Sequence, residues 1–179
     1  HDLVKAGKVR ALGASAMYGY QFYNMQLAAR DNGWTPFSAM ENHYNLLYRE
    51  DERELIPICK QMNVSLMPYS PLAAGHLARA QWKSDSLRGT TDKVAVGKYD
   101  KTEAEDMQIV KRVAELAEKY NCKMSQIAIA WQWAKGIVSP IIGATKTSYL
   151  DDAAGAFAVK LTAEDIAYLE EPYAPHKIV

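Results

Sequence analysis

The chain has 179 residues, of which 49% are hydrophobic and 23% charged, which suits one ordinary globular domain. Its 21 basic and 21 acidic residues cancel, which argues against a nucleic-acid surface, because such a surface needs a basic excess. No apolar run approaches the roughly 18 residues of a membrane span, so we expect no membrane contact.

The chain opens with His1-Asp2-Leu3, without an initiator methionine or a signal-like apolar stretch, and we interpret this opening as the middle of a longer protein. The two cysteines, Cys59 and Cys122, lack the spacing of metal ligands and lie in helix-like segments. We interpret them as buried free thiols, which fits a reducing cytoplasm, and we expect no metal site.

Short apolar strands alternate with helices through the first part of the chain. Residues 5–8 are expected to end a helix at Gly7, and Asn32-Gly33 to end a helix over residues 22–31. The pattern then predicts strands over residues 9–14, 37–41 and 66–69, with a helix over residues 53–62 before the third strand. Residues 76–101 follow as a long polar loop without clear periodicity.

The strongest helical signals come after this loop. Thr102 and Glu105 form a capping box, in which each side chain can satisfy the other's orphan amide. Apolar residues then recur at three-to-four spacing along one helix face: Ile109, Val110, Val113, Leu116, Ala117 and Tyr120. We expect another helix over residues 125–134, a fourth strand over residues 138–142, and two closing helices capped by residues 148–151 and 162–165.

Four strand-helix units in succession predict an α/β fold with a parallel sheet and helices outside it. Four parallel strands can make a small open sheet, but these strands are short and both of their faces look apolar. A closed eight-stranded barrel needs about 250 residues, so four strand-helix units correspond to half of such a barrel. We therefore treat residues 1–179 as a single partial domain.

Two stretches, residues 64–75 and 137–146, share one layout, an apolar strand-like run that breaks into a Pro/Gly/Ser turn before a helix. Such an end leaves backbone N–H groups free to hold an anion, and two in one parallel sheet suggest a phosphate-bearing cofactor.

In the first stretch, Tyr69 ends a strand, where its ring could stack on a flat heterocycle while the next backbone amides meet a pyrophosphate. The alternative is a packed core tyrosine followed by a proline turn. Ser15 lies at the corresponding end of the first strand, where a lone serine is most often a helix cap.

The second stretch ends in Gly143-Ala144-Thr145-Lys146. Small residues allow close approach, threonine offers a hydroxyl and lysine a point charge, a set that suits a phosphomonoester such as the 2′-phosphate of NADP. Lys146 as an ordinary surface lysine is the alternative.

Other chemistry-bearing residues give weaker signals. His43 and Tyr44 follow the second strand and could serve as hydrogen-bond donor and acid, but no Asp or Lys in that segment would tune the tyrosine pKa, so we do not expect catalysis there. His76 and His176 are expected at the surface, and Trp131 is expected to pack in the core with its neighbour Trp133.

Taken in order, these segments resemble the C-terminal half of an aldo-keto reductase. The resemblance is carried by LVKAGKVRALGAS (3–15), NHYNLL (42–47), PYSPLAAG (68–75), IIGATK (141–146) and the closing LEEPYAPH (169–176). The resemblance covers essentially the whole chain. It is strongest to the bacterial and fungal branch of the family, which has a long loop after the seventh strand.

The resemblance implies a TIM barrel that uses NADPH, or sometimes NADH, to reduce aldehydes and ketones, with the present strands as the fifth to eighth. Ser15 matches a contact to the nicotinamide amide, Glu41 stands where a Gln usually does the same, and Tyr69 matches the aromatic that stacks on the nicotinamide. The remaining matches are Ser70, Pro71, Leu72, Gly75 and Leu77 in the pyrophosphate loop, Gly143, Ala144, Thr145 and Lys146 at the 2′-phosphate and ribose, and Tyr149 and Ala153 at the adenine end.

The chain departs from the family pattern at three cofactor positions. Ala16 replaces an Asn, Glu41 replaces an amide donor by a carboxylate, which cannot donate when ionised, and Ala153 lacks an amide side chain. The family's catalytic Asp, Tyr, Lys and His belong to the first half of the barrel and are not present, so we assign no catalytic residue.

Two functions remain open. In one, the chain is the cofactor-binding piece of an aldehyde or ketone reductase and needs the missing N-terminal half as its partner. In the other, it is a non-catalytic half-barrel that binds a nucleotide or a protein, as a pseudoenzyme or subunit.

Overall fold

The computed structural model describes residues 1–83, 97–99 and 102–177. Much of the long polar loop expected over residues 76–101 therefore lies outside the described residues. The start of that segment is not a loop, because the 3₁₀ element η2 (Ala73–Ala78) extends into it.

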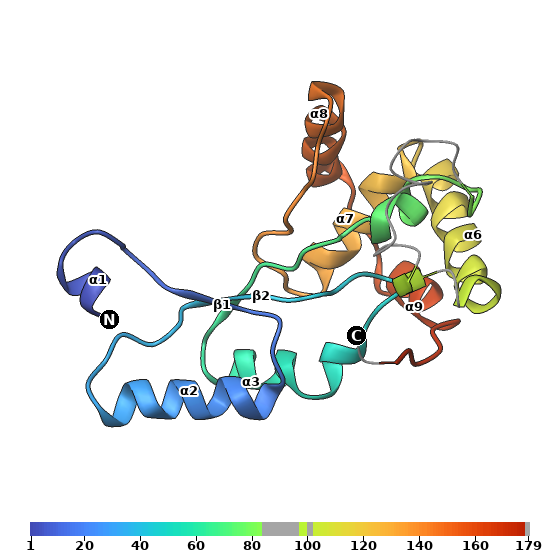
Figure 1. The fold of residues 1–179 in the computed structure, drawn as a ribbon. Coiled ribbons are helices and arrows are strands. Elements are labelled where there is room, and N and C mark those ends of the chain that lie inside the picture. Colours follow the sequence, from blue (N-terminus) through green and yellow to red (C-terminus); the bar gives the residue numbers. More distant parts are fainter. Residues whose placement is uncertain (84–96, 100–101, 178–179) are drawn as a thin grey trace.

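Three short parallel strands lie side by side in the order β1 (Gly13–Ser15), β2 (Ala39–Glu41) and β3 (Ser65–Leu66) (Figure 1). Ser15 lies opposite Glu41, and a parallel bridge between His43 and Tyr69 continues the pairing beyond the strands. Helices connect the strands in chain order, which confirms the expected parallel α/β class.

The first strand is shorter than expected and lies nearer the C-terminal end of its segment. Pairing with the second strand begins where Ser38 N donates to Leu12 O, at 2.9 Å, and the preceding residues turn back on α1 (Asp2–Lys5) through a bond from Val9 N to Leu3 O. Strand structure depends on a partner strand, so apolar residues without one do not extend it. Gly7 has a positive φ of 70° just after α1, as expected for a helix stop.

Two helices, α2 (Gly19–Asp31) and α3 (Leu55–Gln61), contact one another on one side of the sheet (Figure 1). The first begins three residues before the expected start and ends at the expected Asn32-Gly33, where Gly33 has a φ of 66°. The second is preceded by a separate 3₁₀ turn, η1 (Glu50–Arg53), because Pro57 is tolerated only in the first turn of a helix.

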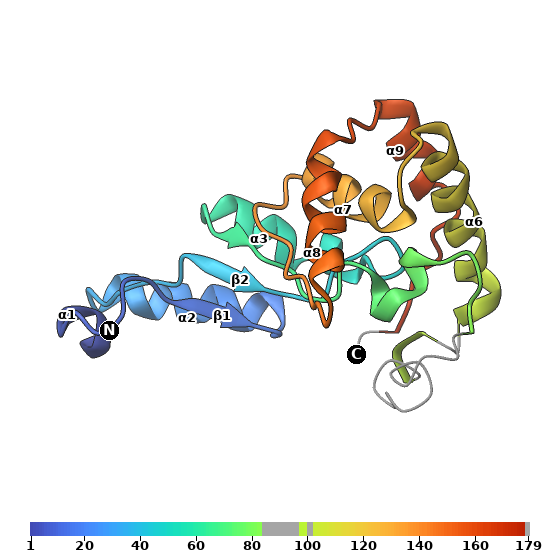
Figure 2. The ribbon, with the colours of Figure 1, turned by 90° about the horizontal axis from the view of Figure 1, so that it is seen from above.

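The other elements gather at the far end of the molecule from α1 (Figure 2). They are α6 (Glu103–Lys119), α7 (Met124–Ala134), α8 (Thr147–Gly155), η4 (Ala156–Ala158) and α9 (Ala163–Glu170). The face predicted for α6 is correct, since all its apolar members are buried except the half-buried Tyr120.

The fourth strand expected over residues 138–142 is wrong. Two backbone bonds tie this segment to the end of β3, from Val138 N to Leu66 O at 3.3 Å and from Ile141 N to Pro68 O at 2.9 Å. No regular ladder follows, because Pro140 has no N–H to donate, and Val138 is 65% exposed. The sheet of the described residues therefore has three strands.

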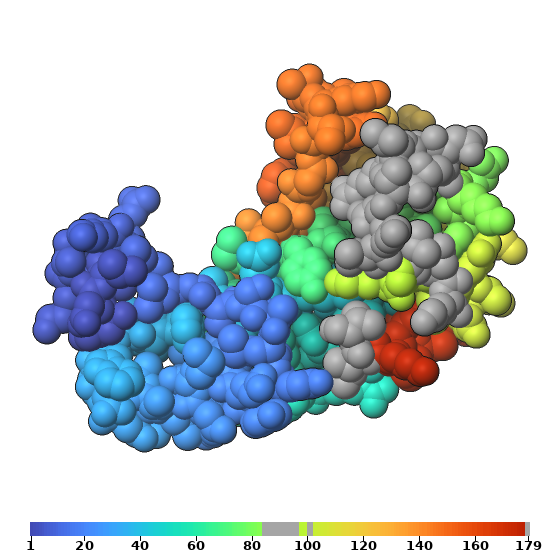
Figure 3. All heavy atoms as spheres, in the orientation of Figure 1, coloured from blue at the N-terminus to red at the C-terminus, as the bar shows by residue number. Residues whose placement is uncertain are grey.

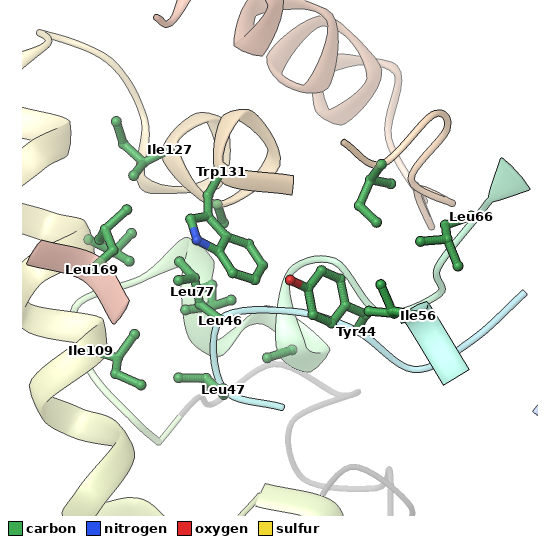
Figure 4. Close-up of a cluster of buried hydrophobic side chains, with 14 of the residues drawn as sticks. Tyr44, Leu46, Leu47, Ile56, Leu66, Leu77, Ile109, Ile127, Trp131 and Leu169 are labelled. Atoms are coloured by element: carbon green, nitrogen blue, oxygen red, sulfur yellow. The ribbon is translucent and has the colours of Figure 1, made fainter. Parts of the chain in front are cut away.

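The hydrophobic core lies between the strand ends and the helices of the far end (Figure 4). Tyr44 and Trp131 meet there with ring centroids 5.1 Å apart, and Gln132 Nε2 donates to Tyr44 O at 2.6 Å. Trp131 is fully buried, which confirms its expected packing role, whereas Trp133 stacks on Phe157 at 4.0 Å outside this core.

One of the three expected helix caps is present. Thr162 Oγ1 accepts from Asp165 N at 3.2 Å, and the Asp165 carboxylate accepts in return from Thr162 N. The Thr102 capping box is wrong, because its hydroxyl donates to Asp106 at 2.7 Å. The cap at residues 148–151 is also wrong, since α8 begins at Thr147 and encloses those residues.

Both cysteines are free thiols, Cys59 buried as expected and Cys122 only half-buried. Among the described helices, none is both long and apolar enough to cross a membrane.

Candidate functional site

The carboxyl ends of the three parallel strands meet at one edge of the sheet, and a cavity of about 390 Å³ opens beside them. Its walls come from the β1–α2 connection and the start of α2, from the residues after β2, and from η1 and the start of α3. The lining residues are Ala16, Met17, Tyr18, Gly19, Gln21, His43, Tyr48, Glu50, Asp51, Arg53, Glu54 and Leu55, with Tyr69 after β3. Ligands of parallel α/β folds bind at this edge, so the cavity is the candidate site.

Three of the predicted residues occupy this edge. Tyr69 lines the cavity, half-buried, while Ser15 and Glu41 lie opposite one another in the sheet and are both exposed. Neither Ser15 nor Glu41 belongs to the cavity wall. The structure thus places the three at adjoining strand ends but brings only Tyr69 into the cavity.

Tyr69 is part of an aromatic stack. The His43 ring lies parallel to it, with centroids 5.1 Å apart, and also stacks with Tyr48 at 4.2 Å. Burial raises the pKa of the Tyr69 phenol, and the negative charges of Asp51 and Glu41 raise it further. The phenol therefore stays protonated, as a stacking platform requires.

Two residues near the end of the long loop reach this stack. Lys98 Nζ lies 4.9 Å from the Tyr69 ring centroid and 3.4 Å from its hydroxyl. Tyr99 is buried, and its hydroxyl lies 2.7 Å from His43 Nε2. Sequence reasoning missed both, because no local pattern indicates that residues 29 or 56 positions apart will touch.

The predicted pyrophosphate loop has an unusual backbone. Ser70, Ala73 and Ala74 have positive φ of 57°, 46° and 55°, and Gly75 follows at 98°. Alanine and serine adopt this conformation only under strain, and such strain concentrates at ligand sites. Successive N–H groups in mixed right- and left-handed conformations make concavities that bind anions.

Other contacts hold this loop in place. Asn45 Nδ2 donates to Ser70 O at 2.9 Å, and Leu72 O accepts from Gly75 N and Leu77 N. Leu77 is fully buried, so its side chain belongs to the core. Pro71 and Leu72 are the turn between Ser70 and η2.

The second predicted cradle is entirely exposed. Gly143, Ala144, Thr145 and Lys146 lead into α8, with Lys146 at its N-cap and its Nζ 5.8 Å from the Tyr149 ring centroid. Tyr149 is 46% exposed and Ala153 is half-buried within α8. The bond from Ile141 N to Pro68 O places the segment before this cradle beside the segment before Tyr69.

The Tyr44 hydroxyl is bonded to a carboxylate and is not free to protonate a substrate. Tyr44 is buried, and its hydroxyl donates to Glu52 at 2.5 Å. Burial, followed by this bond to a carboxylate, raises the pKa of the phenol far above its ordinary value. The expectation against catalysis at Tyr44 stays a prediction, and Glu52 is an acidic partner that sequence reasoning did not identify.

The side chains of the two histidines expected at the surface are covered, so those predictions are wrong. His76 is 7% exposed and stacks on Trp82 at 4.0 Å. The His176 ring bonds Asp106 Oδ1 at 3.1 Å, and its side chain is only 6% exposed. Within the described ranges, no group of three His, Cys, Asp or Glu is placed to hold a metal ion.

Comparison with known proteins identifies the family. The model of the Aldo/keto reductase family matches residues 1–174. The chain is 45% identical to an aldo-keto reductase of Fusarium vanettenii over 179 residues, which cover 99% of the chain and 48% of the relative.

Two further relatives agree. Versiconal hemiacetal acetate reductase of Aspergillus parasiticus is 42% identical over 179 residues, or 99% of the chain and 52% of the relative. A Schizosaccharomyces pombe protein provisionally named aryl-alcohol dehydrogenase is 46% identical over 176 residues, or 98% of the chain and 49% of the relative. The chain therefore spans about half the length of the relatives it matches.

Proposed function

This chain belongs to the aldo/keto reductase family, and from that membership we propose that it is the C-terminal half of an NADPH-dependent reductase of aldehydes and ketones. Membership of this family supports a general oxidoreductase role. The observation that carries the finer proposal is the placement of Tyr69 and the strained residues 70–75 directly after one strand of a parallel sheet.

The residues of the site fit the cofactor. The Tyr69 ring is a neutral, half-buried platform for the nicotinamide, and the positive-φ residues of the following loop suit the pyrophosphate. Lys146 at the N-cap of α8 offers its charge to the 2′-phosphate, with Gly143, Ala144 and Thr145 leaving room for it. When bound, NADPH supplies the hydride that reduces the carbonyl carbon.

The departures from the family pattern change the hydrogen bonds available to the nicotinamide amide. Glu41, when ionised, can only accept, so it would take a hydrogen bond from the amide NH₂ group. Ala16 offers no side-chain contact, which leaves Ser15 as the hydroxyl of β1 nearest this position. The cofactor would therefore be held chiefly by Tyr69 and the two phosphate cradles.

We infer that the acid-base residues come from a separate half of the barrel. The space-filling view has a broad hollow between the N-terminal residues, in dark blue, and α8, in orange (Figure 3). In this proposal an N-terminal half of the barrel would occupy this side. A reducing, cytoplasmic location is part of the proposal, because Cys59 and Cys122 are both free thiols.

A non-catalytic binding module is the second candidate. The observation that favours it is the Tyr44 phenol, which is tied to Glu52 and has a pKa raised far beyond that of a useful proton donor. Such a module would bind NADPH or a protein partner without turnover.

The test measures NADPH binding and turnover with the purified 179-residue chain. We expect NADPH fluorescence to change on titration, to respond less in Tyr69→Leu, and no aldehyde in a broad panel to be reduced. Adding the N-terminal half of the Fusarium vanettenii relative should restore turnover if the chain is half of a reductase. Binding without turnover in that mixture favours the non-catalytic module.

Two results would contradict the proposal. If NADPH does not bind, with or without the added half, the proposed cofactor is wrong. Turnover by the chain alone that is lost in Tyr44→Phe would mean that the chain holds its own acid.

A further inference from the structure

Tyr69 is the proposed platform for the nicotinamide, and its own ring rests on another ring. The His43 ring is inclined to it by only 5°, with the centroids 5.1 Å apart. His43 also stacks with Tyr48, at 4.2 Å and 16°. The orientation of Tyr69 therefore depends on His43.

The backbone fixes this arrangement. His43 and Tyr69 form a parallel bridge, and Tyr69 N donates to Asn42 O at 2.9 Å. Bridged residues on neighbouring strands direct their side chains to the same face, so the two rings are held next to one another.

Hydrogen bonds then fix the rotation of the His43 ring. Asn45 Nδ2 donates one proton to Ser70 O at 2.9 Å and the other to the Tyr99 hydroxyl at 3.1 Å. The Tyr99 hydroxyl, which accepts from Asn45, also bonds His43 Nε2 at 2.7 Å, and the histidine tautomer decides which of the two donates. This bond holds the His43 ring in one orientation whichever partner donates.

The His43 ring is buried and neutral. The residue is 5% exposed, and burial lowers its pKa to about 3, assisted by the charges of Lys98 and His176. Its Nδ1 atom has no hydrogen-bond partner among the described residues. A buried polar atom without a partner is unfavourable for folding, so the ring is better explained by what it holds than by stability.

We propose that His43 is the positioning residue that fixes the plane of the Tyr69 ring, and that the Tyr99 hydroxyl locks His43 in that orientation. The inference rests on the proposed function, in which Tyr69 receives the nicotinamide. A platform held in one plane binds a flat ring better because less motion is lost on binding.

The first test needs no cofactor. The chain is labelled with 3-fluorotyrosine, its Tyr69 resonance is assigned with Tyr69→Phe, and ¹⁹F spectra are compared among variants. His43→Leu should shift and broaden the Tyr69 resonance, and His43→Phe, which keeps a flat ring, should return it toward the wild-type position. Phe22→Leu, which replaces a buried aromatic residue of α2, is the matched control and should leave the Tyr69 resonance unshifted.

The second test measures the NADPH dissociation constant of the same variants. We expect His43→Leu to raise the NADPH dissociation constant about threefold to tenfold, and His43→Phe to recover most of the lost affinity. The dissociation constant of Tyr99→Phe should lie between those of the two His43 variants. Phe22→Leu should bind NADPH as tightly as wild type.

The two tests separate the inference from the proposed function. An unchanged Tyr69 resonance in His43→Leu overturns the inference whether or not NADPH binds. Equal losses of affinity in His43→Phe and His43→Leu also overturn it, because the stacked ring would then not matter. A wild-type chain that does not bind NADPH removes the proposed function, while the fluorine spectra still decide whether His43 positions Tyr69.

Discussion

In the proposed function, Lys146 is the residue that would distinguish NADPH from NADH. It is exposed at the N-cap of α8, so a contact with a 2′-phosphate would be worth about 1 kcal/mol or somewhat more. We expect Lys146→Ala to raise the NADPH dissociation constant roughly tenfold and to leave that for NADH nearly unchanged. Fluorescence titration with both cofactors measures this.

Lys111→Ala, on the exposed face of α6, is the matched control for the general effect of removing one positive charge. Equal losses for NADPH and NADH in Lys146→Ala would mean that the lysine acts on the fold or on the shared pyrophosphate.

His176 connects the C-terminal segment to α6 and makes stability depend on pH. Its ring bonds Asp106 Oδ1 at 3.1 Å, and its backbone N–H donates to Glu50 at 2.8 Å. The bond to Asp106, followed by the charges of Asp106, Glu50 and Glu105, raises the pKa of His176. The stabilisation is therefore complete below the unfolded pKa of about 6.5 and is lost as pH rises through the folded value.

We expect His176→Gln to lower the free energy of unfolding most at about pH 5.5 and least at about pH 8.5, because glutamine keeps a donor but not the charge. Urea unfolding at the two pH values measures the difference between variant and wild type. The same loss at both values would show that the charge of His176 is not involved.

Among the elements, α9 has the clearest local start. The Thr162 side chain accepts from Asp165 N, and the Asp165 carboxylate accepts from Thr162 N. We expect Thr162→Ala to lower the free energy of unfolding by about 1 kcal/mol, measured by chemical denaturation. Ser148→Ala is the control, because Ser148 lies inside α8 and makes no cap. A similar cost in both variants would contradict a specific capping role.

At the scale of the whole molecule, β1 is the exposed edge of the sheet. The outer side of β3 is partly covered by the bonds to Val138 and Ile141, whereas β1 has a neighbouring strand only at β2 within the described residues. Unpaired edges promote association, and exposed Trp34, Tyr20 and Val138 add apolar surface.

We therefore expect the 179-residue chain to dimerise, aggregate or bind a hydrophobic dye when alone, and less so when an N-terminal half is added. Light scattering and dye fluorescence with and without that half measure this. A monodisperse monomer with one cooperative unfolding transition would show that the chain closes its own core.

The sequence predicted several features that depend on local chemistry. The apolar face of α6, the stop of α2 at Asn32-Gly33 and the cap of α9 were correct, because each depends on residues within a turn or two of one another. The family resemblance, read from short motifs, was confirmed by the match over residues 1–174. The predicted roles of the cofactor residues stay predictions.

Only the tertiary structure decided which polar groups meet and which strands pair. Residues 138–142 had a strand-like composition, yet Pro140 interrupts the bonds that a neighbouring strand would require. His176 was expected at the surface and is covered by contacts with Asp106, and Tyr99 reaches His43 across 56 positions of sequence. Burial and pairing depend on what the fold places opposite a residue, and no local pattern in the sequence contains that information.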